Sequence, residues 1–412
     1  MFYYYKYNNK VLFSLKEHRG FVNINEEMAR TDNSTLYFLG KLPPAKSRMS
    51  FILSDSDMFY LDKESMDLLN CPEIKRPSMS WLSEKIKGRQ IVYINTAYEH
   101  WESALEKPHP KKWNIHIVAL GDIGSTLLTG LKLLGGDKIA NIGIFDRKMN
   151  NMKRWEFEMN QITPPFNYQA LPDVRIINED QLMSCDLLIF CAAKGYGLDN
   201  SVSDVRMAQY QQNSDIVSTY AQKARAAKFK GIFAILSDPV DLLCKKVFLE
   251  SNYSSGKIFD YKGLKPDQIR GFGLGVMNSR AVYYANKYPK YHHYIKEGRA
   301  FGPHGTGLVI ADSIEHYNND LSIELTDLTV KANLKMRALG FKPYIAPALS
   351  SGVYSILAMI SEQWHYSSTF LGGVYMGANN RLINGHTELE RLKLPEKLMD
   401  RLKASFDRLS IL

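Results

Sequence analysis

Apolar residues in the second part of the chain gather in short runs, and segments with helical spacing separate these runs. The runs are Ile115–Leu120, Ile142–Asp146, Asp186–Cys191 and Gly231–Leu236, with a shorter one near Val174–Ile177. Continuous apolar strands that alternate with helices are typical of a parallel sheet covered on both faces. The pattern therefore predicts an α/β fold with a doubly wound parallel sheet.

Apolar residues three or four positions apart predict helices in the same region. These helices cover residues 204–227 (with Asp204 as its N-terminal cap), 325–339, 348–360 and 395–409. Active groups of parallel sheets gather at the carboxyl ends of the strands. The residues that follow Gly121, Asp146, Cys191 and Leu236 are therefore candidate site residues.

Residues 1–109 follow a different pattern, in which short apolar bursts are separated by Gly, Pro, Asn and Asp. The bursts predict a small α+β module. Its strands are expected near residues 11–13, 36–39, 51–53 and 91–94, and its helices near 80–87 and 98–105. The stretch Glu106–Trp113 contains two prolines and is predicted to be a linker. We therefore expect three domains, 1–109, 110–274 and 275–412.

The composition narrows the class of protein. The chain of 412 residues is 45% hydrophobic and 23% charged, as in ordinary globular proteins. It has no run of about 18 apolar residues, so no membrane span is expected. The formal charge of +9 is dispersed along the chain. This dispersal favours a solvated basic surface that attracts anionic small molecules. We therefore expect that the protein does not bind nucleic acid.

The cysteines indicate the compartment. Cys71, Cys185, Cys191 and Cys244 are scattered and form no C-x-x-C pair. We predict buried structural thiols in a reducing cytoplasm and no metal site. The N-terminus has no apolar core of a signal peptide, which agrees with a cytoplasmic location.

The turn Gly121–Gly124 has the features of a dinucleotide site. Gly121 lets the backbone approach a pyrophosphate, and Gly124 lets the following helix pack on the strand. Asp146 comes 25 residues after Gly121, close to the spacing of about 20 expected for a carboxylate on a ribose 2′-hydroxyl. Ala119 stands at the first glycine position of G-x-G-x-x-G, so the match is partial. An ordinary strand–helix unit remains the alternative.

Further motifs follow in a fixed order. They are Gly121–Gly124, Asp146, Cys191–Ala193, Val205–Asn213, Ser237–Asp241, Gly271–Gly273, Asn278–Arg280, Gly302–Gly305, 340–350 and Gly372–Gly377. In this order and spacing, residues 114–412 resemble the lactate/malate dehydrogenase family. The resemblance implies an NAD-binding Rossmann domain, an α+β catalytic domain and a homo-oligomer. It leaves the first 109 residues unexplained.

The resemblance implies hydride transfer between a nicotinamide and C2 of a 2-hydroxy or 2-oxo acid. His304 matches the histidine that exchanges a proton with the hydroxyl. Arg280 matches the arginine whose planar fork binds the substrate carboxylate. Arg206 matches the arginine on a mobile loop that polarises the carbonyl.

The implied cofactor is NAD. The cofactor-binding residues are Gly121, Asp122, Ile123, Gly124, Asp146, Arg147, Ala192, Ala193 and Ser237. A carboxylate at Asp146 accepts a hydrogen bond from a 2′-hydroxyl and repels a 2′-phosphate. Arg147 and Lys148 directly after it leave NADP as the less favoured alternative.

The surroundings of His304 depart from the family. Met277 occupies the position of the aspartate that orients the histidine. Asn278 would be a neutral partner in a register shifted by one residue, but Arg280 then loses its match. Asp238 replaces the family's asparagine, and it is a candidate carboxylate partner of His304 from a different side.

Other departures concern the substrate. Pro303 and Thr306 stand where the family has acids beside the histidine motif, and loop 194–205 is longer than in typical lactate dehydrogenases. That loop sets substrate choice in the family, so pyruvate is not the expected substrate. Lys342 lies in a region that lines the family's pocket and is a candidate ligand for a second anionic group. Its alternative is an exposed loop residue.

Three functions agree with these observations. The first is an NAD-dependent oxidoreductase acting on a 2-hydroxy/2-oxo acid. The second is an NAD-binding regulatory module without ordinary dehydrogenase activity, with residues 1–109 docking a protein or peptide partner. The third is a dehydrogenase for a larger or peptide-linked substrate that the N-terminal module recognises.

Overall fold

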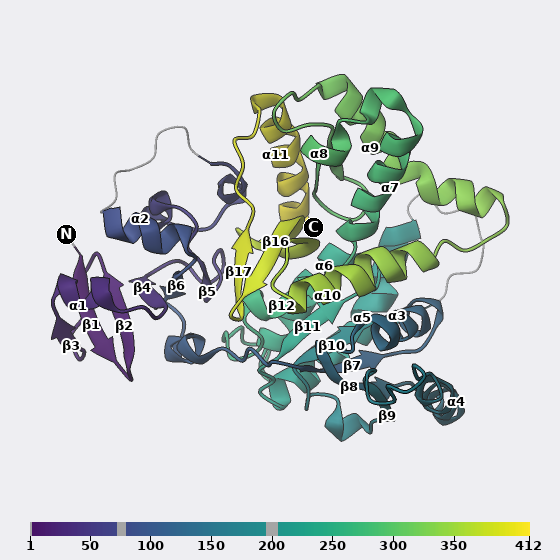
Figure 1. Cartoon of the computed structure of the whole chain (residues 1–412), viewed down its shortest axis with the longest axis horizontal. Coiled ribbons are helices and arrows are strands. Elements are labelled where there is room, and N and C mark those ends of the chain that lie inside the picture. Colours follow the sequence, from purple (N-terminus) through teal and green to yellow (C-terminus); the bar gives the residue numbers. More distant parts are fainter. Residues whose placement is uncertain (1, 72–79, 195–204) are drawn as a thin grey trace.

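Two large β-sheets organise the molecule (Figure 1). The computed structural model describes residues 2–71, 80–194 and 205–412, and for 205–209 it describes the backbone alone. The first quarter of the chain forms a six-stranded sheet, and the remainder forms a nine-stranded mixed sheet with helices packed around it. The predicted α/β class is confirmed.

The nine-stranded sheet contains a doubly wound parallel part. Its order is β17-β16-β15-β12-β11-β10-β7-β8-β9. The parallel strands are β7 Trp113–Val118, β8 Ile139–Phe145, β9 Asp173–Ile176, β10 Leu187–Phe190, β11 Ile232–Ile235 and β12 Ile269–Gly271. The chain runs outward from β7 to β9 and then returns to β10 on the other side of β7. The carboxyl ends of β7 and β10 meet at this reversal, which is where ligands of doubly wound sheets usually bind.

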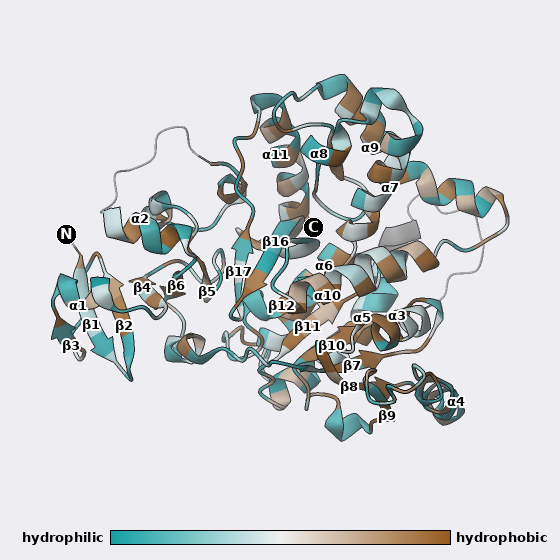
Figure 2. Cartoon of the chain, viewed as in Figure 1, coloured by the Kyte–Doolittle hydropathy of each residue, from teal (hydrophilic) through white to brown (hydrophobic). Residues whose placement is uncertain are grey.

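Helices cover both faces of the parallel strands. They are α3 Asp122–Leu134, α4 Met149–Asn160, α5 Val205–Ala226 and α6 Val240–Asn252. Successive residues of β10 point to opposite faces: Leu187 and Ile189 join the apolar cluster of α3, whereas Leu188 and Phe190 join that of α5 and α6. This burial on both faces explains the continuous apolar runs, and Figure 2 shows these central strands mainly in brown. Each buried Leu or Phe contributes about 1.5–3 kcal/mol of transfer free energy.

The C-terminal part extends the same sheet and adds a helical layer. Strand β15 pairs antiparallel with β12 through Ser368 and Gly271. The elements are α7 Leu274–Lys287, α8 Tyr294–Glu297, β13 Arg299–Phe301, β14 Val309–Ala311, α9 Asn319–Ala338, a π-helix Pro347–Tyr354, α10 Ser355–Ile360, β15 His365–Leu371, β16 Val374–Ile383, β17 His386–Leu389 and α11 Glu396–Ile411. The predicted helix 325–339 begins six residues earlier, because the Asn318 side chain accepts the N–H groups of Asp320 and Leu321.

The six-stranded sheet has the order β3-β1-β2-β4-β6-β5. Its elements are β1 Tyr3–Tyr7, β2 Lys10–Ser14, β3 Val22–Ile24, α1 Glu26–Thr31, β4 Leu36–Gly40, β5 Ser50–Ile52, 3-10 turns Ser56–Tyr60 and Met66–Leu69, α2 Ser80–Lys87, β6 Ile91–Asn95 and a 3-10 helix Trp101–Glu106. The predicted α+β character and the helix 80–87 are confirmed. The helix expected at 98–105 is a shorter 3-10 helix, and β1 and β3 were not predicted.

The six-stranded sheet packs directly on the C-terminal elements. One apolar cluster includes Phe13 and Phe38 of this sheet together with Leu398 and Leu402 of α11. The backbone of Leu392 donates to the carbonyl of Leu69 over 3.0 Å. The two regions therefore share one hydrophobic core.

The predicted linker is held in place. Lys107 forms an ion pair with the buried carboxylate of Asp267, and His109 Nε2 lies 3.3 Å from Glu362 Oε1. Although burial opposes the charge, Lys107 holds the pKa of Asp267 below its ordinary value. Residues 107–110 are irregular, as their prolines predict, but they do not form a free tether.

The cysteines are all free thiols. Only Cys244 is fully buried, whereas Cys71, Cys185 and Cys191 are partly buried, so the prediction of four buried thiols holds for one of them. Desolvation still raises the pKa of Cys185 and of Cys191, which disfavours the reactive thiolate. None of the described helices combines the length and the apolar character that a membrane span requires.

Candidate functional site

The turn after β7 shows why its glycines differ in role. A Cβ on Gly124 would lie 2.0 Å from the carbonyl oxygen of Ala119, so α3 can begin here only with glycine. A Cβ on Gly121 would meet nothing within 4 Å, so the turn is open at that point. Ala119 has φ +73°, the left-handed conformation that glycine adopts most readily. Ala119 therefore adopts the left-handed conformation although it replaces the first glycine of the pattern.

Asp146 is anchored beside this turn. Its Oδ2 accepts the Leu120 N–H over 2.8 Å, and its Oδ1 accepts the Lys148 N–H over 3.0 Å. A carboxylate has about four lone-pair sites, so both oxygens can accept a further donor. The open helix start and the anchored acid together fit the pyrophosphate and the ribose of a dinucleotide.

The loops after β10 and β11 are joined at the carboxyl edge of the sheet. Ser237 Oγ donates to the Ala192 carbonyl over 2.8 Å. The buried Asn213 of α5 donates to the Asp238 carbonyl over 2.7 Å and accepts the Lys194 N–H over 2.9 Å. Asn213 therefore fixes both loops at this edge. The sequence motif contained this residue, but its buried position was not visible there.

His304 lies in the loop after β13 and faces Asp238. Its Nδ1 is 3.1 Å from Asp238 Oδ1. The His304 side chain is 11% exposed, whereas that of Asp238 is 39% exposed. Because an ionised carboxylate only accepts hydrogen bonds, Nδ1 carries the proton in the neutral ring. Nε2 is then the nitrogen that can exchange a proton.

Two further residues position His304. The His304 N–H donates to Asp241 Oδ2 over 3.1 Å. Burial at the start of α6 raises the pKa of Asp241 to about 6, and this hydrogen bond from His304 opposes the rise. A Cβ on Gly273 would lie 2.8 Å from His304 Cβ, so the histidine packs against the first turn of α7. Both residues belong to motifs in the sequence, but neither was assigned a role from it.

Helix α7 presents one face to His304. Residues 273, 277 and 280 are three or four positions apart and share that face. An Arg280 guanidinium nitrogen lies 3.5 Å from Met277 Sδ. Asn278 accepts the Tyr294 hydroxyl over 2.8 Å, on another side of the helix. Spacing therefore places Met277, rather than Asn278, on the same side of α7 as Gly273.

The remaining predicted site residues are Lys342 and Arg206. The Lys342 ammonium is 3.4 Å from Asp122 Oδ2, in an exposed pair at the cofactor turn. Such exposed pairs contribute at most about 1 kcal/mol. Arg206 lies in the first turn of α5, and its side chain is outside the described residues. In the described part of the chain, no group of three or more His, Cys, Asp and Glu side chains could hold a metal ion.

The fold is that of lactate and malate dehydrogenases over nearly three quarters of the chain. A lactate dehydrogenase from a Medee basin deep-sea metagenome library aligns with a TM-score of 0.60 and 15% identity, covering 73% of this chain and 97% of its own. The minor L-lactate dehydrogenase of Enterococcus mundtii gives 0.58 and 16%, covering 73% and 98%. The malate dehydrogenase of Picrophilus torridus gives 0.57 and 14%, covering 72% and 95%.

The likeness is one of fold. No protein-family model and no curated protein matches the sequence. The aligned share covers nearly the full length of each dehydrogenase, whereas an additional segment of this chain has no counterpart in them. The comparisons therefore show the fold of the chain. Its function is inferred from the residues at the carboxyl edge of the parallel strands.

The two glycines of the cofactor turn allow a matched comparison. Gly124→Ala is expected to lower stability by at least about 1–3 kcal/mol, because its methyl group collides with backbone. Gly121→Ala is expected to leave stability nearly unchanged and to weaken NADH binding about tenfold, because its methyl group enters the space open to a phosphate. Thermal unfolding and NADH fluorescence titration measure the two effects. Unchanged NADH affinity in a folded Gly121→Ala protein would contradict the assigned cofactor turn.

Proposed function

We propose that the protein is an NAD-dependent oxidoreductase acting on a 2-hydroxy/2-oxo acid. The proposal rests on one observation above all, the pairing of His304 Nδ1 with Asp238 beside the open end of the doubly wound sheet. This pairing leaves Nε2 as the group that exchanges a proton. We further propose that residues 110–274 hold the dinucleotide and residues 275–412 bind the substrate.

The residues at the cofactor turn fit NAD. Gly121 and the first N–H groups of α3 would hold the pyrophosphate, and Asp146 would accept a ribose hydroxyl. The other proposed contacts are Asp122, Ile123, Gly124, Arg147, Ala192, Ala193 and Ser237. NAD, when bound, supplies or accepts the hydride. The carboxylate of Asp146 favours NAD over NADP.

The chain's own residues manage the proton and the substrate charge. During reduction, His304 Nε2 gives a proton to the oxygen that was the carbonyl, and it recovers one in the reverse direction. Asp238 stabilises the cationic ring and fixes its orientation. Arg280 binds the carboxylate, and Arg206 polarises the carbonyl. When the imidazole is cationic, its pair with Asp238 is neutral, so Asp238 does not repel an anionic substrate.

A panel of 2-oxo acids tests this function directly. The full-length protein is expected to oxidise NADH in the presence of at least one member, followed by the loss of absorbance of the reduced nicotinamide. The panel includes acids with larger and with charged side chains, because the loop after β10 is longer than in the resembled family. Intact NADH binding without turnover of any member would reject the proposal.

Met277 favours a second candidate, an NAD-binding module without dehydrogenase activity. Met277 is buried and apolar, at a position of α7 where the resemblance implies a carboxylate. Under this alternative the pairing of Asp238 with His304 has no chemical role. NADH binding without turnover, unaltered by changes at Asp238, would support it.

A further inference from the structure

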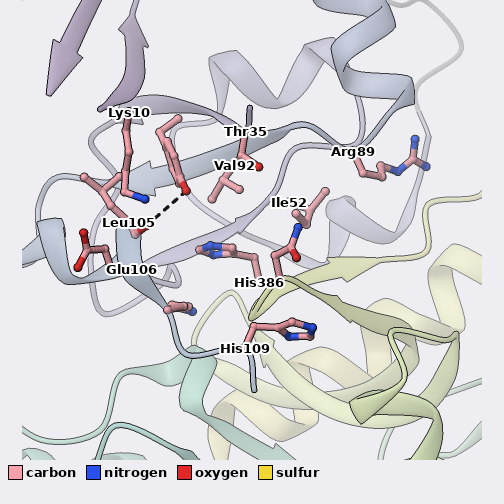
Figure 3. Close-up of a pocket in the computed structure, with 12 residues that line it drawn as sticks. Lys10, Thr35, Ile52, Arg89, Val92, Leu105, Glu106, His109 and His386 are labelled. Carbon is pink, nitrogen blue, oxygen red and sulfur yellow. Dashed lines mark hydrogen bonds between the residues drawn. The ribbon is translucent and has the colours of Figure 1, made fainter. Parts of the chain in front are cut away.

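A cavity lies between the six-stranded sheet and the β16–β17 hairpin (Figure 3). It has a volume of about 590 Å³, within the usual range of about 300–1,000 Å³ for small-molecule sites. None of the residues of the cofactor turn or around His304 lines it. The cavity is therefore a separate feature, and nothing in the proposed dehydrogenase chemistry uses it.

One part of the wall is apolar. Ile52 of β5, Val92 of β6 and Leu105 of the 3-10 helix contribute aliphatic side chains. The Tyr37 hydroxyl donates to the Leu105 carbonyl over 3.3 Å, as the dashed line in Figure 3 shows. This bond fixes the tyrosine ring along the wall. The cavity therefore has a shaped surface for the carbon skeleton of a ligand.

Hydrogen-bond donors dominate the polar part of the wall. Lys10, Thr35 and Asn384 line it with an ammonium, a hydroxyl and an amide group. His386 is buried, and its Nδ1 lies 2.9 Å from Ser50 Oγ. Burial and then the nearby charge of Lys107 hold the pKa of His386 well below its ordinary value, so the ring adds no charge.

Two of the cations in the lining have acidic partners next to it. Arg89 bonds Glu388 and Lys107 pairs with Asp267, so a ligand in the cavity would meet the charge of Lys10 first. Lys10 lies over the Tyr37 ring, 5.5 Å from its centroid, and no acid within the described chain is at ion-pair distance from it. Glu106 is the single acid among the lining residues.

We propose that this cavity binds a small organic anion through a carboxylate or phosphate group held by Lys10. The donor-rich wall would bind the anionic group, and Ile52, Val92 and Leu105 would contact the carbon skeleton. Charge-assisted hydrogen bonds of this kind are shorter and stronger than neutral ones. Since both sheets contribute walls, the bound anion lies at their junction.

Calorimetric titration with inorganic phosphate and with citrate tests the proposal and separates the two anion chemistries. At least one probe is expected to bind the full-length protein saturably. Lys10→Gln is expected to weaken that binding about tenfold, whereas Lys10→Arg keeps the charge and retains most of it. Lys87→Gln is the matched control, because Lys87 is an exposed lysine of the same region outside the cavity.

Saturating NADH in every titration occupies the proposed dinucleotide site, so phosphate binding there does not contribute. Thermal unfolding without ligand shows whether Lys10→Gln is folded. If it is not, Lys10→Met, which keeps the aliphatic stem without the charge, provides the comparison, and unchanged affinity of that variant would reject the assignment. Absence of saturable binding by both probes would overturn the proposal, as would an equal loss in Lys10→Gln and Lys87→Gln.

Discussion

Asp238→Asn is expected to lower kcat for the oxo acid by about 10²–10⁴-fold while NADH affinity stays unchanged. Asparagine preserves the size of the side chain, but its neutral amide neither stabilises a cationic imidazole nor enforces a proton on Nδ1. The wrong nitrogen of His304 then carries the proton in part of the population. Steady-state rates and NADH fluorescence titration separate the effect on proton exchange from an effect on cofactor binding.

Two variants give this prediction its controls. Asp215→Asn removes an exposed carboxylate from α5, away from the histidine, and should leave kcat unchanged. Adding Met277→Asp to Asp238→Asn places a carboxylate about one helical turn after Gly273, at the position where the resemblance implies one. The double variant should recover at least about tenfold of the lost rate if a carboxylate partner is what the histidine needs. A rate unaffected by Asp238→Asn alone would contradict the role of the pair.

Deleting residues 1–109 is expected to abolish the cooperative folding of the remaining chain. The deletion exposes the apolar cluster that Phe13 and Phe38 share with Leu398 and Leu402 of α11. It also removes Lys107 and leaves the buried carboxylate of Asp267 without its cation. Loss of one partner of a buried pair costs about 3–5 kcal/mol, a large share of the usual 5–15 kcal/mol stability of a folded protein.

Point variants extend this test without removing a segment. Phe13→Ala should cost about 3–5 kcal/mol and Leu402→Ala about 2–5 kcal/mol, and each should lower the midpoint of one shared unfolding transition. Calorimetry of the full chain and both variants measures this. Two separate transitions, or a 110–412 fragment that unfolds cooperatively near the midpoint of the full chain, would show that the N-terminal sheet is an independent domain.

The parallel sheet was predictable because its strands have a strong local signature. The segment Leu187–Phe190 is apolar at every position, which is typical of a strand buried on both faces. The helix at Ser80–Lys87 was likewise visible from spacing. Boundaries were less accurate: α9 begins at Asn319 because of a capping bond that hydrophobic spacing does not reveal.

The candidate site was predictable only as a set of residue types. Glycines 121 and 124, Asp146 and His304 were identified from order and spacing. The different structural roles of the two glycines could not be predicted. Residue 124 must be glycine because a side chain would collide with the Ala119 carbonyl, whereas Gly121 borders open space. The roles of Asn213 and Asp241 depend on hydrogen bonds between loops that are distant in sequence.

The sequence alone determined the α/β class and the likeness to lactate and malate dehydrogenases, and it identified Gly121–Gly124 as the candidate cofactor turn. These features depend on local periodicity and on ordered motifs, which a single chain displays directly. Only the tertiary structure decided which residues face one another. It placed Asp238 beside His304, packed that histidine against Gly273, and merged the N-terminal sheet with the core of α11. Such pairings arise from packing between distant segments, and no local pattern encodes them.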